Sequence, residues 1–174
     1  FLVNQTRMLN QRDPAVAVLR EGGFYAAWIS EAYSGVTMNV DPDGRPGGLA
    51  GGATLYNVQV MGRHFDANGL ALGNEVPVSG AARIAANPSL AVAEDGRILV
   101  TWSSLSAKLS PGVGDNPDRW DAFARGVDAA AGPIGEEFRL NEHIGGDQFT
   151  PQVAALGNQF QVVWTSLAQD GARE

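Results

Sequence analysis

The sequence repeats itself, and this feature restricts the possible folds more than any other. A motif that begins with proline and ends with tryptophan occurs three times, at Pro14–Trp28, Pro88–Trp102 and Pro151–Trp164. A second motif precedes each proline and reads Phe1-Leu-Val-Asn4, Val76-Pro-Val-Ser79 and Phe138-Arg-Leu-Asn141. Self-similarity at a regular spacing is typical of repeat architectures, so the units are expected to start at residues 1, 76 and 138.

Each unit reads as β-structure. Its apolar runs are short, rich in β-branched and aromatic residues, and bounded by glycine, asparagine, aspartate and proline. Asp95-Gly96 lies between two such runs, which predicts a tight hairpin. The strands expected in the first unit are residues 1–4, 14–20, 23–30 and 55–66. Four-stranded antiparallel units in tandem predict an all-β chain that forms part of a β-propeller.

The predicted units are residues 1–75, residues 76–137 and a partial third unit, residues 138–174. The first two carry insertions in one connection, at residues 31–54 and 105–119, which predicts that both project from one face. Two full blades and part of a third are fewer than the four to eight that close a propeller. We therefore expect open strand edges, completed by another protein chain or by the rest of the same chain.

Composition excludes several classes of function. The net charge is −7 and the isoelectric point is near 4.7, which argues against nucleic-acid binding. The sequence has no cysteine, so it cannot form disulfides, zinc-thiolate sites or a cysteine nucleophile. No apolar run approaches 18 residues, so no membrane span is expected.

The first insertion contains the pattern Asn39-Val-Asp41-Pro-Asp43-Gly44. Oxygen ligands at alternate positions before a glycine match the first half of a calcium-binding loop. The second insertion offers similar ligands at less regular spacing. The predicted calcium ligands are Asn39, Asp41 and Asp43, with Asp115 and Asp118 as a second set. The alternative interpretation of each segment is a solvated turn.

Aromatic and arginine residues suggest two further hypotheses. Trp120, Tyr33 and Tyr56 could form a sugar-stacking surface, with burial in strands as the alternative. Arg63 and Arg125 could bind an acidic sugar, but their recurrence at one repeat position favours a structural ion pair or a strand-surface residue. The repeated tryptophans are expected to pack between blades, because every blade must bury that face.

No catalytic residue is predicted. His64 and His143 are not repeated, and their spacing is not typical of a metal pair or a catalytic triad. Glu136 and Glu137 are adjacent, so along a strand their side chains would point to opposite faces.

Several motifs together resemble a bacterial extracellular repeat family, found in large secreted calcium-binding, adhesin-like proteins. They read Glu137-Phe138-Arg-Leu-Asn141, Gly146-Asp147-Gln148, Pro151-Gln-Val-Ala-Ala-Leu156, Trp164-Thr-Ser166 and, in the first unit, Arg63-His-Phe-Asp66-Ala-Asn-Gly69. The resemblance implies a β-propeller-type repeat protein that is secreted or on the bacterial cell surface. It also implies a non-catalytic role in adhesion, scaffolding or assembly, with calcium as a stabilising ion.

A weaker resemblance, to sialidase-like propellers, rests on the segment Pro88–Trp102. It implies an alternative function as a fragment of a glycan-active enzyme, with a glycan as partner. A further alternative is a subunit whose open blade is completed by another chain.

Overall fold

The computed structural model describes residues 2–7, 10–39, 52–80, 84–105 and 120–167. These residues form strands and turns without a helix, which confirms the all-β prediction. Among them there is accordingly no helix that could cross a membrane. The strands are β1 (Gln11–Val18), β2 (Phe24–Asn39), β3 (Gly52–Phe65), β4 (Val76–Pro77), β5 (Ile84–Val92), β6 (Ile98–Leu105), β7 (Trp120–Asp128), β8 (Gly132–Arg139), β9 (Gln148–Leu156) and β10 (Gln159–Ser166).

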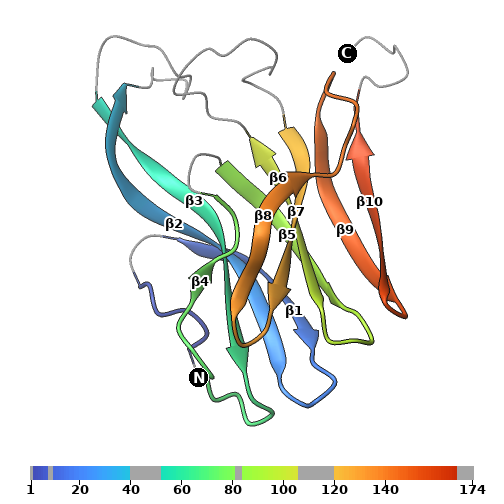
Figure 1. Cartoon of the computed structure of the whole chain (residues 1–174). Coiled ribbons are helices and arrows are strands. Elements are labelled where there is room, and N and C mark those ends of the chain that lie inside the picture. The colour runs from blue at the N-terminus through green and yellow to red at the C-terminus, as the bar shows by residue number, and fades with distance from the viewer. Residues whose placement is uncertain (1, 8–9, 40–51, 81–83, 106–119, 168–174) are drawn as a thin grey trace.

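The strands form three antiparallel sheets that lie side by side (Figure 1). The first sheet has the order β1-β2-β3-β4, the second β5-β6-β7-β8, and the third pairs β9 with β10. Strand β5 lies against both β1 and β9, so the first strands of the three sheets are neighbours. The prediction of tandem four-stranded antiparallel sheets is therefore confirmed for the first two sheets.

The sheets are offset from the sequence repeats. The motif at Val76, expected to open the second unit, forms β4 and pairs with Met61 and Gly62 of β3. Phe138 likewise closes the second sheet, because it pairs with Ala124 of β7. Residues 2–4, expected as the first strand, are not part of a strand. Self-similarity reveals the period of a repeat but not where each sheet begins, which explains this error.

The first insertion lengthens a hairpin. Residues 31–54 were expected to connect two strands, but β2 continues to Asn39 and β3 already begins at Gly52. Their pairing includes Tyr33 with Tyr56 and Asn39 with Gly52, with a register shift after Tyr33. In the second sheet Leu105 pairs with Trp120, and residues 106–119 lie outside the described part. The last residues of β2 and β6, after which the described strands stop, lie at the same end of the sheets (Figure 1).

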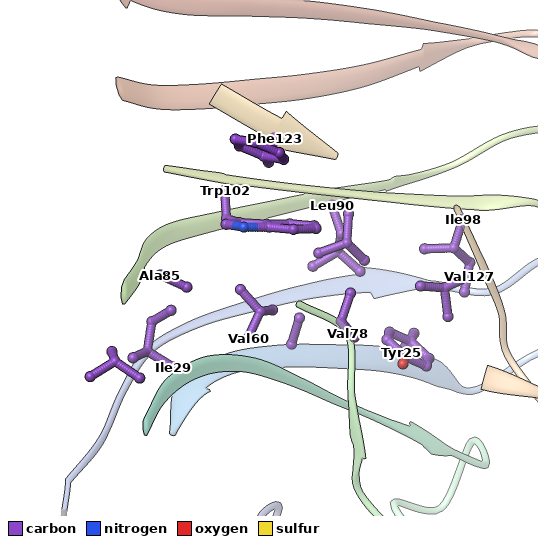
Figure 2. Packing of buried hydrophobic residues seen from close by; sticks show 13 residues of the cluster. Tyr25, Ile29, Val60, Val78, Ala85, Leu90, Ile98, Trp102, Phe123 and Val127 are labelled. Carbon is purple, nitrogen blue, oxygen red and sulfur yellow. The ribbon is translucent and has the colours of Figure 1, made fainter. Parts of the chain in front are cut away.

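The main core lies between the first two sheets (Figure 2). Alternate residues of β2 face the second sheet, because successive side chains of a strand point to opposite faces. Tyr25, Ala27 and Ile29 therefore meet Leu90 and Trp102 in one buried cluster. Trp102 also stacks on Phe123 of β7, with ring centroids 6.4 Å apart. This packing between sheets is the role that the sequence predicts for the repeated tryptophan.

Candidate interaction site

Among the described residues, two sheet faces at opposite ends of the stack are not covered by a further sheet. The residues of β1 and β2 that point away from the second sheet form the Trp28 face, consisting of Val16, Val18, Phe24, Ala26 and Trp28. Val16 and Val18 are exposed, whereas Ala26 and Trp28 are already buried in a small cluster with Val3 packed against it. In the third sheet Phe160 points toward the second sheet, where its ring lies under the Arg97 guanidinium. The opposite side is the Val163 face, consisting of Ala154, Leu156, Gln161 and Val163.

The repeat provides an internal comparison for each open face. Val16 is 63% exposed, whereas Leu90, at the same repeat position, is 9% exposed because the first sheet covers it. Val163 is 69% exposed, whereas its equivalents Ala27 and Thr101 are fully buried under the next sheet. Val16 and Val163 are thus exposed at positions that neighbouring sheets bury elsewhere in the same chain.

The Trp28 face contains an apolar groove of about 340 Å³. Val3, Pro14, Val16, Phe24 and Trp28 line it together with the polar residues Asn4, Gln11 and Arg12. The Trp28 indole N–H donates a hydrogen bond of 2.9 Å to the Gln11 side-chain oxygen, so the polar atom of this ring is satisfied. What the groove offers a partner is therefore mainly apolar surface.

The repeated arginines hold the chain segment that precedes their own sheet, and for Arg63 this segment borders the Trp28 face. Arg63 donates to the carbonyl oxygens of Gly73 (2.8 Å) and Val3 (3.0 Å). Arg125 makes the equivalent bonds to Gly135 (2.9 Å) and Val78 (3.0 Å). These hydrogen bonds give both arginines a structural role, but with backbone carbonyls as partners in place of the expected ion pair.

A repeated glutamate completes the same arrangement. The Glu75 carboxylate accepts hydrogen bonds from the backbone N–H groups of Gln5 (2.7 Å) and Thr6 (3.1 Å). Glu137 accepts one from the Gly80 N–H (2.8 Å). Sequence reasoning did not assign this role, but the glutamates recur at one repeat position, which was the available signal.

A second feature missed from the sequence lies in the first strand of each sheet. Asp13, Asn87 and Thr150 each precede the repeated proline and have φ of 52°, 51° and 51°. Such values are uncommon for residues with a side chain, and each position coincides with a shift in strand register. The recurring proline was the only sequence signal for these bulges. The three positions carry one carboxylate, one amide and one hydroxyl.

An ionic network joins the start of β1 to β2. Arg12 pairs with Asp13 (2.6 Å) and Glu31 (3.0 Å), and the Asn10 side chain also donates to Glu31 (2.7 Å). The hydrogen bond from Arg12 lowers the pKa of Glu31, against the opposing effect of partial burial, and the bond from Asn10 lowers it further.

The three residues of the predicted aromatic surface come from two sheets, and the surface stays a prediction. Tyr33 and Tyr56 occupy paired positions on β2 and β3 of the first sheet. Trp120 is half-buried at the start of β7 in the second sheet, and its backbone N–H donates to Asp147 (3.0 Å).

The predicted calcium ligands fall mostly beyond the described part of the chain. Asn39 is the last residue of β2. Asp41, Asp43, Asp115 and Asp118 lie outside the described residues. Within the described ranges no three acidic or histidine side chains are arranged to hold a metal ion.

Comparison with known proteins gives a similarity of fold. No family model matches the sequence, and no curated protein matches it. Among solved structures, the chain is similar to the crystal structure of a thermostable family-43 glycoside hydrolase, with a TM-score of 0.51 and 12% sequence identity. The match covers 92% of this chain and 50% of that chain, so this chain spans about half the length of that enzyme. That enzyme is a β-propeller, and at this identity the likeness concerns the fold alone.

Proposed function

We propose that the chain is a non-catalytic sheet-stacking module of a β-propeller-type protein and that it serves scaffolding or assembly. Its Trp28 face and Val163 face bind further sheets of the same repeat. The observation that carries this proposal is the exposure of Val16 and Val163 at positions where the same chain elsewhere buries its side chains.

Energetics favour covering these faces. Burying apolar surface contributes roughly 25 cal/mol per Å², so each exposed valine or leucine adds to the driving force for docking. The two faces differ, so a contact between them is head-to-tail and can extend into rings or filaments. Stacking of this kind would reproduce the packing between the first and second sheets.

The resemblance to secreted repeat proteins supports a more specific version. In it the module lies outside a bacterial cell, takes part in adhesion, and gains stability from calcium bound at Asp41 and Asp43. These features are separate from stacking, and the calcium feature has its own test in the Discussion.

Glycan processing is the second candidate, favoured by the fold similarity to a family-43 glycoside hydrolase. Glycoside hydrolysis usually needs two carboxylates flanking the scissile bond. Of the three equivalent bulge positions, only Asp13 is a carboxylate. This candidate predicts release of reducing sugar from an oligosaccharide panel and its loss in the Asp13→Asn variant.

Sedimentation velocity over a range of chain concentrations tests the stacking proposal. We expect the sedimentation coefficient to rise with concentration and Val163→Asp to abolish the rise. Leu70→Asp is the matched control, because Leu70 is 66% exposed but lies in the connection between β3 and β4. A chain that stays monomeric up to hundreds of micromolar would contradict the proposal.

A further inference from the structure

Residues 2–4 occupy the position before the first sheet that residues 77–79 occupy before the second. In both places an arginine of the following sheet binds the carbonyl oxygen of a valine, Val3 through Arg63 and Val78 through Arg125. In both places a glutamate of the following sheet accepts from the backbone N–H one or two residues after the motif. The segments are therefore held in the same way.

In the first two sheets, the end of this motif also binds the third strand. Val78 donates its N–H to the Val60 carbonyl (2.8 Å), and the Ser79 hydroxyl accepts from the Val60 N–H (2.9 Å). Leu140 and Asn141 bind Ala122 in the same way, with distances of 2.8 and 2.9 Å. One residue of each third strand thus has both backbone groups satisfied by the motif.

The side-chain amide of Asn4 is oriented like the side-chain amide of Asn141. The Asn141 amide nitrogen donates to the carbonyl oxygen two residues later, that of His143 (2.8 Å). The Asn4 amide nitrogen makes the same bond to the Thr6 carbonyl (2.6 Å). Its oxygen therefore points as the Asn141 oxygen does, yet neither this oxygen nor the Val3 N–H has a partner among the described residues.

We infer that residues 2–4 are the outer strand of a further sheet of the same repeat, which docks on the Trp28 face. This inference rests on the proposed function and adds the recognition chemistry. The Val3 N–H and the Asn4 oxygen bind the two backbone groups of one residue in the third strand of the docked sheet. The apolar side chains of that sheet fill the groove beside Trp28.

The occupant is a sheet of this repeat, supplied by a partner chain, whose third strand has a free outer edge. The interface between the first two sheets supports this choice. Val3 and Asn4 hold the repeat positions of Val78 and Ser79, and Val16 holds the repeat position of Leu90. Exposure agrees with it: Leu2, the equivalent of Pro77, is 53% exposed, and Val3 and Asn4 are only half-buried. By contrast, Val78, Ser79 and Asn141 are buried.

The test adds such a sheet to the chain of residues 1–174. A copy of residues 76–137 is joined before Phe1, so that Phe1–Asn4 follows Glu137 as Phe138–Asn141 does in the natural sequence. Amide hydrogen exchange is then measured at the alanine of the copy that corresponds to Ala122. The Asn4→Ser variant keeps a side-chain oxygen, as Ser79 does, whereas Asn4→Ala removes it.

We expect the natural residue and Asn4→Ser to protect this amide and Asn4→Ala to speed its exchange about tenfold, the effect of losing one such hydrogen bond. In the chain without the copy, Asn4→Ala and Asn4→Ser should unfold at the same temperature, because the oxygen has no partner there. If the added sheet shields Val16 but Asn4→Ala changes nothing, the inference is wrong and stacking stands. If Val16 stays as exposed as before, the proposed stacking function is wrong as well.

Discussion

Tyr25 lies directly over Gly62, and the space between them leaves no room for a methyl group. A side-chain carbon on Gly62 would overlap the Tyr25 hydroxyl and the edge of its ring. In the second sheet the equivalent positions hold Leu99, which is smaller than tyrosine, and Ala124, which is larger than glycine. The two pairs exchange bulk at one position for bulk at the other, as close packing requires.

Gly62→Ala should therefore destabilise the chain by about 1–3 kcal/mol through overpacking. Adding Tyr25→Leu to Gly62→Ala recreates the pair of the second sheet and should recover most of this loss, measured by urea unfolding. Tyr25→Phe is the control, because the buried Tyr25 hydroxyl has no hydrogen-bond partner among the described residues and its removal should cost little. A double variant as unstable as the two single changes added together would contradict this packing account.

Exchanging the residue types at two of the three bulge positions should change stability in opposite directions. Thr150 is β-branched and is unfavourable at its φ of 51°, whereas asparagine, present at residue 87, tolerates this region well. Thr150→Asn should raise the thermal unfolding midpoint. Asn87→Thr should lower the midpoint, with a loss of about 1 kcal/mol in the free energy of unfolding. Two shifts of the same sign would show that side-chain contacts outweigh backbone conformation at these positions.

Glu31 predicts a small dependence of stability on pH. Its folded-state pKa lies below its ordinary value of about 4.3, so the unfolded chain binds more protons between these values. The contribution is therefore present at neutral pH and lost as the pH falls through the folded-state pKa. Because the Arg12 side chain is substantially exposed, Glu31→Gln should cost only about 0.2–1 kcal/mol at pH 7.

Chemical unfolding at pH 7 and at pH 2.5 measures this difference. We expect the gap between the natural chain and Glu31→Gln to close at the lower pH. Glu142→Gln is the control, since Glu142 is exposed and has no partner among the described residues. A gap that persists unchanged at pH 2.5 would rule out the ionic origin.

Calcium binding by the first insertion predicts a rise in the unfolding temperature with added Ca²⁺. At a hundred times the dissociation constant, one bound ion adds about 2.7 kcal/mol of stability. Replacing Asp41 and Asp43 by asparagine should remove this response, and Mg²⁺ at equal concentration should produce less of it. If added Ca²⁺ leaves the unfolding temperature of the unsubstituted chain unchanged, the proposed calcium site is wrong.

The all-β fold and the tandem sheets could be predicted because the repeat and its turn residues are local signals. The residues at which each sheet begins could not be predicted. The motif at Val76 pairs with the preceding strand β3, and a single sequence does not show which strands pair. The bulge at Asp13 also went unpredicted, because proline only restricts the preceding residue and does not fix its φ.

The candidate site was predictable only as a general expectation of open edges. Which side of the β1–β2 hairpin remains open depends on which face of β2 packs against the second sheet. The segment Phe24–Ile29 does not show this in the sequence, because its residues are apolar on both faces of the strand. The roles of Arg63 and Glu75 likewise needed the structure, since their partners are backbone groups.

The central claim is that the Trp28 face is a docking face for a further sheet. The sequence has no cysteine, so Val16→Cys places a single thiol on this face, and Leu70→Cys places one away from it. The direct measurement is the thiol labelling rate in the chain of residues 1–174 and in the same chain extended by the copy of residues 76–137. We predict that extension slows labelling at position 16 at least about tenfold, as expected for a group sequestered by more than 1.4 kcal/mol, and leaves position 70 unchanged. Equal labelling rates at position 16 with and without the added sheet would contradict the claim.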